Sequence, residues 1–122
     1  MAKSSHNDVL DAALNVIKNN CTHMILCSAQ PTSRTEAVTT YALASQAMGS
    51  GDFTIGTGDA SGRKCAVAAK NAISVSASGN GNHVALVDGS RLLWVTTCNQ
   101  QAVTAGNTVN IPTWDIEIAS PV

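Results

Sequence analysis

The chain has few charged residues, few aromatic residues and no long apolar run. Only 12% of its 122 residues are charged, against about 25% in typical soluble domains, and the formal net charge is −1. This charge balance and an aromatic content of 3% argue against a nucleic-acid binder, which needs a basic surface and stacking platforms. No stretch approaches the roughly 20 apolar residues of a membrane span. We therefore expect neither a nucleic acid nor a membrane as partner.

The first twenty residues lack the apolar core of a secretory signal. We therefore expect the chain to be made and assembled in a cytoplasm, where thiols stay reduced and are largely buried. If a pair oxidises later, a Cys21–Cys27 bond is disfavoured, because an extended strand rises about 3.3 Å per residue. Bonds to Cys65 or Cys98 are better candidates.

The length fits a single domain, residues 1–122, and its first clear pattern is a helix over residues 7–20. Ser5 or Asn7 is a suitable N-cap. One face of this helix is apolar and consists of Leu10, Ala13, Leu14 and Ile17. Two interpretations remain open. The helix closes one side of the fold, or it docks a partner through Leu10, Leu14 and Ile17.

The body of the chain, residues 21–118, reads as short strands. Residues 23–28 form one apolar run, residues 35–48 favour a short strand or an irregular segment, and six or seven strands are expected after Gly49. Turns are expected at residues 79–82, 88–89 and 105–107, where Gly, Asn and Asp cluster. The predicted fold class is mainly β: a small β-sandwich or barrel, jelly-roll or Ig-like, with one N-terminal helix. Residues 1–6 are expected to form a flexible arm and residues 119–122 a tail.

Two groups of residues have the composition, but not the spacing, of a phosphate or metal site. The run from Gly56 to Lys64 is rich in glycine but lacks the spacing of a phosphate-binding loop, so we expect a loop between strands with two exposed cations. Cys21, His23 and Cys27 match no standard zinc spacing and lack a fourth ligand. We therefore expect no metal and no cofactor.

A nucleophile could be drawn from Cys98 or Cys65 with His83 as base and Asp88 as its orienter. Nothing in the sequence places these residues together, and Cys98 follows Thr96-Thr97 at an expected strand end, where a small residue is usually buried. No pair of carboxylates suggests glycoside hydrolysis. We expect no catalytic residue. Trp94 and Trp114 are expected in the core, and Trp114 is also a candidate interface anchor.

Four stretches carry a resemblance to a known group of proteins. They are DVLDAALNVIKNN, MILCSAQPTSRTEAVTTYALA, DASGRKCAVAAK and NHVALVDGSRLLWVTTCNQQAVTAGNTVNIPTWDIEI. Together they cover most of the chain, and they resemble small proteins encoded in the structural regions of tailed bacteriophages and prophages. The resemblance implies a non-enzymatic virion component, and no catalytic residues carry over from it.

Among virion roles, a capsid decoration or cement protein fits a small, β-rich and weakly charged chain best. A neck, collar or tail-fibre component is the alternative, and a small host-directed binding or regulatory protein is the alternative from another class. The expected partners are copies of the chain and other virion proteins, either the major capsid protein or neck and tail proteins. Weak charge favours self-association. The segment from Asp115 to the C-terminus, which ends in Pro121 and Val122, is expected to detach from the sheet and reach an adjacent subunit, and residues 1–6 are expected to do the same.

Overall fold

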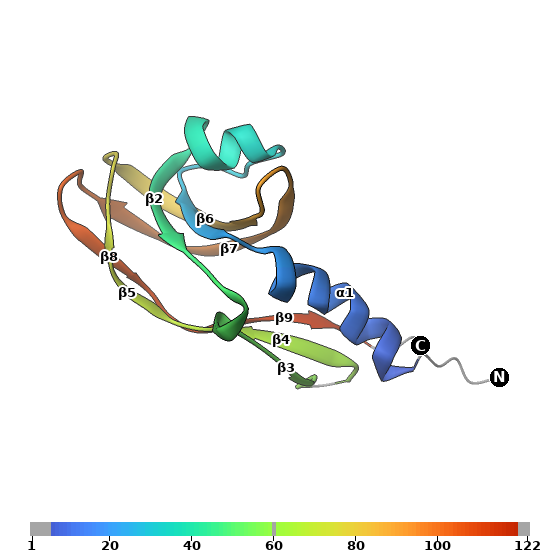
Figure 1. The fold of residues 1–122 in the computed structure, drawn as a ribbon. Coiled ribbons are helices and arrows are strands. Elements are labelled where there is room, and N and C mark those ends of the chain that lie inside the picture. Colours follow the sequence, from blue (N-terminus) through green and yellow to red (C-terminus); the bar gives the residue numbers. More distant parts are fainter. Residues whose placement is uncertain (1–5, 60, 120–122) are drawn as a thin grey trace.

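A computed structural model describes residues 6–59 and 61–119, which form one N-terminal helix followed by antiparallel strands (Figure 1). The helix α1 spans Asn7–Asn20. The strands are β1 (His23–Cys27), β2 (Ala42–Ala47), β3 (Phe53–Thr57), β4 (Arg63–Val67), β5 (Lys70–Ser74), β6 (Gly79–Val87), β7 (Leu92–Val103), β8 (Thr108–Ile111) and β9 (Trp114–Ile118). The predicted class, mainly β with one N-terminal helix, is confirmed. No helix in the described part of the chain combines the length and the apolar character that crossing a bilayer requires.

The strands form an open barrel. One sheet has the order β2-β1-β6-β7, a second β3-β4-β9, and a third β5-β8. The second and third sheets continue one another along the chain. The β4–β9 pairing ends at Val67 and Trp114, and the β5–β8 pairing begins at Lys70 and Ile111. A bridge between Ala44 and Val75 joins β2 to the end of β5. On the opposite side, β7 ends its sheet with no further strand paired to it among the described residues, so the barrel is open between β7 and β8.

Helix α1 closes one side of the barrel rather than presenting its predicted apolar face. Leu14 and Ile17 are buried in the core, and the helix packs on β3 and β4. Arg63 Nε donates to Asp11 at 2.7 Å, and this ion pair fixes the helix to β4. The helix is capped by His6, whose Nδ1 accepts from the Asp8 amide, so the prediction of an Asn7 cap is wrong. The other predicted cap, at residue 5, lies outside the described residues.

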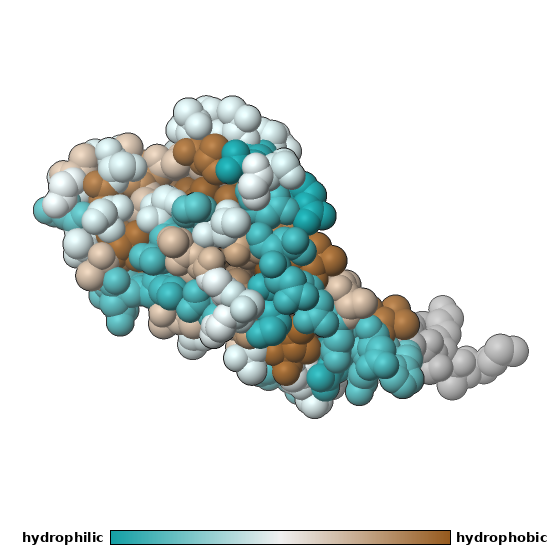
Figure 2. Space-filling model, in the orientation of Figure 1, coloured by the Kyte–Doolittle hydropathy of each residue, from teal (hydrophilic) through white to brown (hydrophobic). Residues whose placement is uncertain are grey.

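Lys18 anchors the last turn of α1 in an unexpected way. Its ammonium donates to the carbonyls of Ser50 at 2.9 Å and Phe53 at 2.7 Å, so it holds the helix against the start of β3. The outer surface of α1 leaves Val9 and Val16 exposed. On the face shown in Figure 2, apolar patches are small and separated by polar residues.

Two apolar clusters form the core. The first lies inside the barrel and draws on every sheet and on α1, with Phe53, Leu86 and Ile116 fully buried in it. The second lies on the outer face of the four-stranded sheet, around Ile25 and Cys27. A short π-helical turn, Glu36–Thr40, covers this second cluster. Within residues 35–48, the strand is confined to Ala42–Ala47, and the expectation of a strand or irregular segment is wrong for the helical turn before it.

The predicted turn at residues 79–82 is wrong, because these residues begin strand β6. A Cβ on Gly81 would lie 2.6 Å from Leu26 Cγ, so glycine leaves the space that the Leu26 side chain occupies. The predicted hairpin at residues 88–89 is confirmed, with Asp88 and Arg91 closing the turn between β6 and β7. The predicted turn at residues 105–107 is also present, with Gly106 at φ +91°.

Candidate functional site

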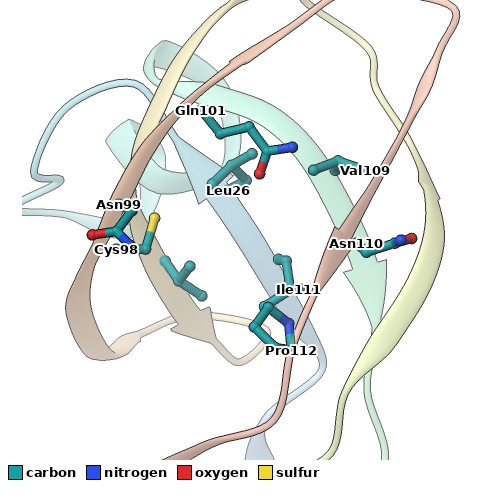
Figure 3. Close-up of a pocket in the computed structure, with 9 residues that line it drawn as sticks. Leu26, Cys98, Asn99, Gln101, Val109, Asn110, Ile111 and Pro112 are labelled. Atoms are coloured by element: carbon teal, nitrogen blue, oxygen red, sulfur yellow. The ribbon is translucent and has the colours of Figure 1, made fainter.

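The open side of the barrel carries a groove between β7 and the β8–β9 segment (Figure 3). A cavity of about 230 Å³ adjoins a second of about 170 Å³. Both are lined by Val84, Cys98, Ile111 and Pro112. We call this feature the β7–β8 groove and define it by these shared residues together with Leu26, Thr96, Thr97, Asn99, Gln101, Val109, Asn110, Trp114 and Asp115.

The groove is apolar at its base and nearly free of charge. Leu26 and Val84 line it from β1 and β6, and Val109 and Ile111 line it from β8. Figure 3 shows Gln101 reaching from the β7 side toward Val109. The single charged residue among those that line the groove is Asp115, whose Oδ2 lies 3.6 Å from Lys64 Nζ. The groove therefore suits an uncharged occupant.

Strand β7 forms one wall of the groove and divides into two unlike halves. Its first half is partly buried, since Leu92 and Val95 pack on the outer cluster and Leu93 packs on the inner one. Its second half is exposed at every side chain of residues 97–102 and carries no charge. An edge strand also presents unpaired amide and carbonyl groups along one side, and β7 is bulged here, since Gly81 of β6 pairs with Gln101 whereas His83 pairs with Thr97. The second half of β7 therefore offers both backbone and side-chain hydrogen-bonding groups.

The structure does not assemble the hypothetical Cys–His–Asp set. His83 pairs across strands with Thr97, and its Nδ1 lies 2.6 Å from Asn82 Oδ1. The Asp88 carboxylate is used within its own turn, where it accepts from the Ser90 amide at 2.8 Å and from Arg91 Nε at 2.6 Å. These hydrogen bonds lower the pKa of Asp88. Asp88 therefore organises the hairpin rather than orienting His83.

The cysteines are free and differ in exposure. Cys21, Cys27 and Cys65 are buried as expected, whereas Cys98 is exposed in the middle of β7, so the expectation of a buried residue at a strand end is wrong. Desolvation raises the pKa of Cys21 and of Cys27 to about 11 and also raises the pKa of Cys98. An activated nucleophile needs the opposite shift, toward the thiolate.

The candidate zinc ligands and the glycine-rich run fall in separate parts of the fold. Cys21 lies in the inner cluster and Cys27 in the outer one, on opposite faces of the sheet. Within residues 6–59 and 61–119, no three His, Cys, Asp or Glu side chains gather closely enough to hold a metal ion. The glycine-rich run begins in the last residues of β3 and ends in the first residues of β4. Its two cations lie in β4 and are paired: Arg63 Nε with Asp11 Oδ1 and Lys64 Nζ with Asp59 Oδ1, each at 2.7 Å.

The remaining interface candidates fall in different places. Leu10 is half-buried on α1, and Pro121 and Val122 lie outside the described residues. Trp114 is half-buried against the core and lines the groove, and its Nε1 is buried with no hydrogen-bond partner. Trp94 is 37% exposed, so its predicted place in the core is wrong.

Sequence reasoning missed the exposed half of β7. Residues 96–102 lack both apolar alternation and charge, but this pattern does not by itself indicate that a strand lies at the edge of a sheet. The segment from Asp115 onward, expected to detach as an arm, is instead paired with β4 as far as Ile118.

No protein family, no curated protein and no solved structure matches this chain. The site therefore rests on geometry: an open groove with an uncharged edge strand as its wall.

Proposed function

We propose that this chain is a non-enzymatic structural component of a tailed-phage virion, specifically a capsid decoration or cement protein. The observation that carries the proposal is the exposed, uncharged half of β7 beside an open apolar groove. Such a surface offers a neighbouring protein hydrogen-bonding groups along β7 and a groove that can receive apolar side chains.

The size of the groove supports assembly over small-molecule binding. The groove is divided into two open cavities of about 230 and 170 Å³, each below the roughly 300–1,000 Å³ of ordinary ligand sites. A space of this size takes a few side chains of a neighbouring protein. The low charge of the chain supports the same conclusion, because weakly charged surfaces resist association poorly.

The resemblance to proteins from the structural regions of tailed phages is the reason for proposing a phage virion as the particle to which the chain binds. In this account the chain joins the virion in the host cytoplasm, where it contacts the major capsid protein and copies of itself. Quantitative mass spectrometry of purified particles tests the proposal. A fixed ratio close to that of the major capsid protein supports a decoration role. A few copies per particle would place the chain in the neck, collar or tail, and absence from particles would overturn the virion role.

A matched pair of variants tests whether the exposed half of β7 contacts the particle. Thr97 and Thr54 are both exposed strand residues, on β7 and β3 respectively. Thr97→Lys places a charge on the free edge and should reduce occupancy on particles by about tenfold or more, whereas Thr54→Lys should leave occupancy unchanged. Equal occupancy for the two variants would show that the contact surface lies elsewhere.

A further inference from the structure

We propose that the β7–β8 groove binds a segment of the major capsid protein in which an apolar side chain lies beside a lysine or arginine. The apolar side chain enters the groove above Leu26 and Val109, and the basic side chain pairs with Asp115. This inference rests on the proposed function in one respect, namely that the groove is an assembly surface. It adds the chemistry of the partner.

The base of the groove can hold an apolar side chain. Its larger cavity, of about 230 Å³, is lined by Leu26, Val109 and Ile111. Burial of apolar surface is the main favourable term in most protein association. Amide side chains also line this cavity, from Asn99 and Gln101 on one wall and Asn110 on the other. Because each amide both donates and accepts, these side chains can bind the backbone of an entering segment without regular strand pairing.

The end of the groove at β9 differs from the rest, because it contains a charge. Asp115 lines the second cavity together with Pro112 and Trp114. Its side chain is 36% exposed, so water reaches the carboxylate from only part of its surroundings. A cation from a bound segment would therefore be screened less here than on an open surface.

Negative charge exceeds positive charge around Asp115. The Lys64 ammonium lies 2.7 Å from Asp59 and 3.6 Å from Asp115, so one cation is shared between two carboxylates. Glu117 is the cross-strand partner of Lys64 in the β4–β9 pairing. Three carboxylates thus lie around one ammonium. Charge complementarity therefore favours an occupant that brings a cation to this end of the groove.

A second copy of the chain is a poor source of that cation. The chain has seven lysines and arginines, and each of those in the described residues is already engaged within the molecule. Four of them form ion pairs with carboxylates, and two donate to backbone carbonyls: Arg63, Lys64, Lys70 and Arg91, then Lys18 and Arg34. A copy would have to break one of these contacts to reach Asp115. The observation favours a different protein as the occupant.

The test titrates the full chain onto capsid particles that lack it. Asp115→Asn should weaken binding about fivefold or more, and Asp115→Lys should weaken it further, because repulsion replaces attraction. Added salt should weaken the unchanged protein more than Asp115→Asn. The matched control is Asp8→Asn on α1, which removes the same charge from a side chain that is 89% exposed and should leave binding unchanged.

Alkylation of the unchanged protein gives a readout that does not depend on the folding of a variant. N-Ethylmaleimide should react with Cys98, which is exposed, while the other cysteines are buried. Because Cys98 lines both cavities, the adduct should obstruct the groove and weaken particle binding at least about tenfold. Cys98→Ser treated in the same way should keep its affinity.

The outcomes separate this inference from the proposed function. Particle binding that survives alkylation, or that Asp115→Asn and Asp8→Asn change equally, would overturn the groove inference and leave the virion role standing. A dimer in solution that alkylation of Cys98 dissociates would show that a second copy occupies the groove, which also overturns the inference. A chain that binds no particle would overturn the virion role and, with it, the capsid partner.

Discussion

The two edges of the four-stranded sheet are both uncharged, but only one of them is covered. At the β2 edge, the Leu43 carbonyl accepts from the amides of Ser76 at 2.8 Å and Ala77 at 3.3 Å, and Ala44 bridges Val75. At the β7 edge, no described strand follows, and a groove takes the place of the next strand.

The two uncharged edges therefore differ in whether another segment of the same chain covers them. Where the chain itself can reach, as at β2, it covers the edge with its own backbone. At β7, no described segment covers the edge, and the strand lies exposed beside the groove. The closed side should therefore dominate the stability of the monomer, and the open side should dominate association.

The largest expected effect compares two buried leucines. Leu86 is fully buried away from the groove, whereas Leu26 lines the groove. We expect Leu86→Ala to lower the free energy of unfolding by about 4 kcal/mol and Leu26→Ala by about 2 kcal/mol, since a site beside existing space loses fewer contacts. Urea denaturation of the monomer measures both. Equal losses would mean that the open side is packed as tightly as the closed side.

An intermediate effect is expected at the hairpin that begins the buried half of β7. Hydrogen bonds from Ser90 and Arg91 lower the pKa of Asp88, so the folded state prefers the carboxylate. This stabilisation is present above the ordinary Asp pKa of about 3.9 and is lost as the pH falls through the lowered value. The urea midpoint should fall below about pH 4 in the unchanged protein.

The Asp88→Asn variant isolates this contribution. Its urea midpoint should fall less steeply on acidification, because the contribution of the Asp88 carboxylate is gone. It should still fall, because Asp52 and Glu36, whose pKa values are also lowered, still titrate. Identical pH profiles for the variant and the unchanged protein would show that Asp88 is not a source of the acid sensitivity.

The smallest effect compares the two tryptophans. Trp114→Phe removes a buried Nε1–H that has no partner, so the monomer should be unchanged or more stable by up to about 1 kcal/mol. Trp94→Phe, at a side chain that is 37% exposed, should change stability by less than about 0.5 kcal/mol. Thermal unfolding of both variants measures the difference. A loss above about 2 kcal/mol at Trp114 would mean that its indole fills the core more completely than its burial suggests.

The helix and most strands were predictable because their patterns are local. Leu10, Leu14 and Ile17 recur at the helical period, and the alternation from Phe53 onward recurs at the strand period. The hairpin signal at Asp88-Gly89 also held, although Asp88 acts through its carboxylate on the two residues that follow Gly89.

The rest depended on contacts between distant segments. Gly79 and Gly81 resemble turn glycines, but they make room for Leu43 and Leu26 from other strands. The outer cluster requires a helical turn over Ile25 that no local pattern indicates. The candidate site escaped prediction for the same reason, because an edge is defined by the absence of a neighbouring strand and not by the residues within it.

The most direct test of the exposed β7 edge is amide hydrogen exchange of the chain alone and of the chain bound to capsid particles. Peptides covering residues 96–102 should exchange more slowly on the particle, while peptides from β2, which is already bridged within the chain, should not change. Slowing confined to another segment, or equal exchange of residues 96–102 in the two states, would contradict the account.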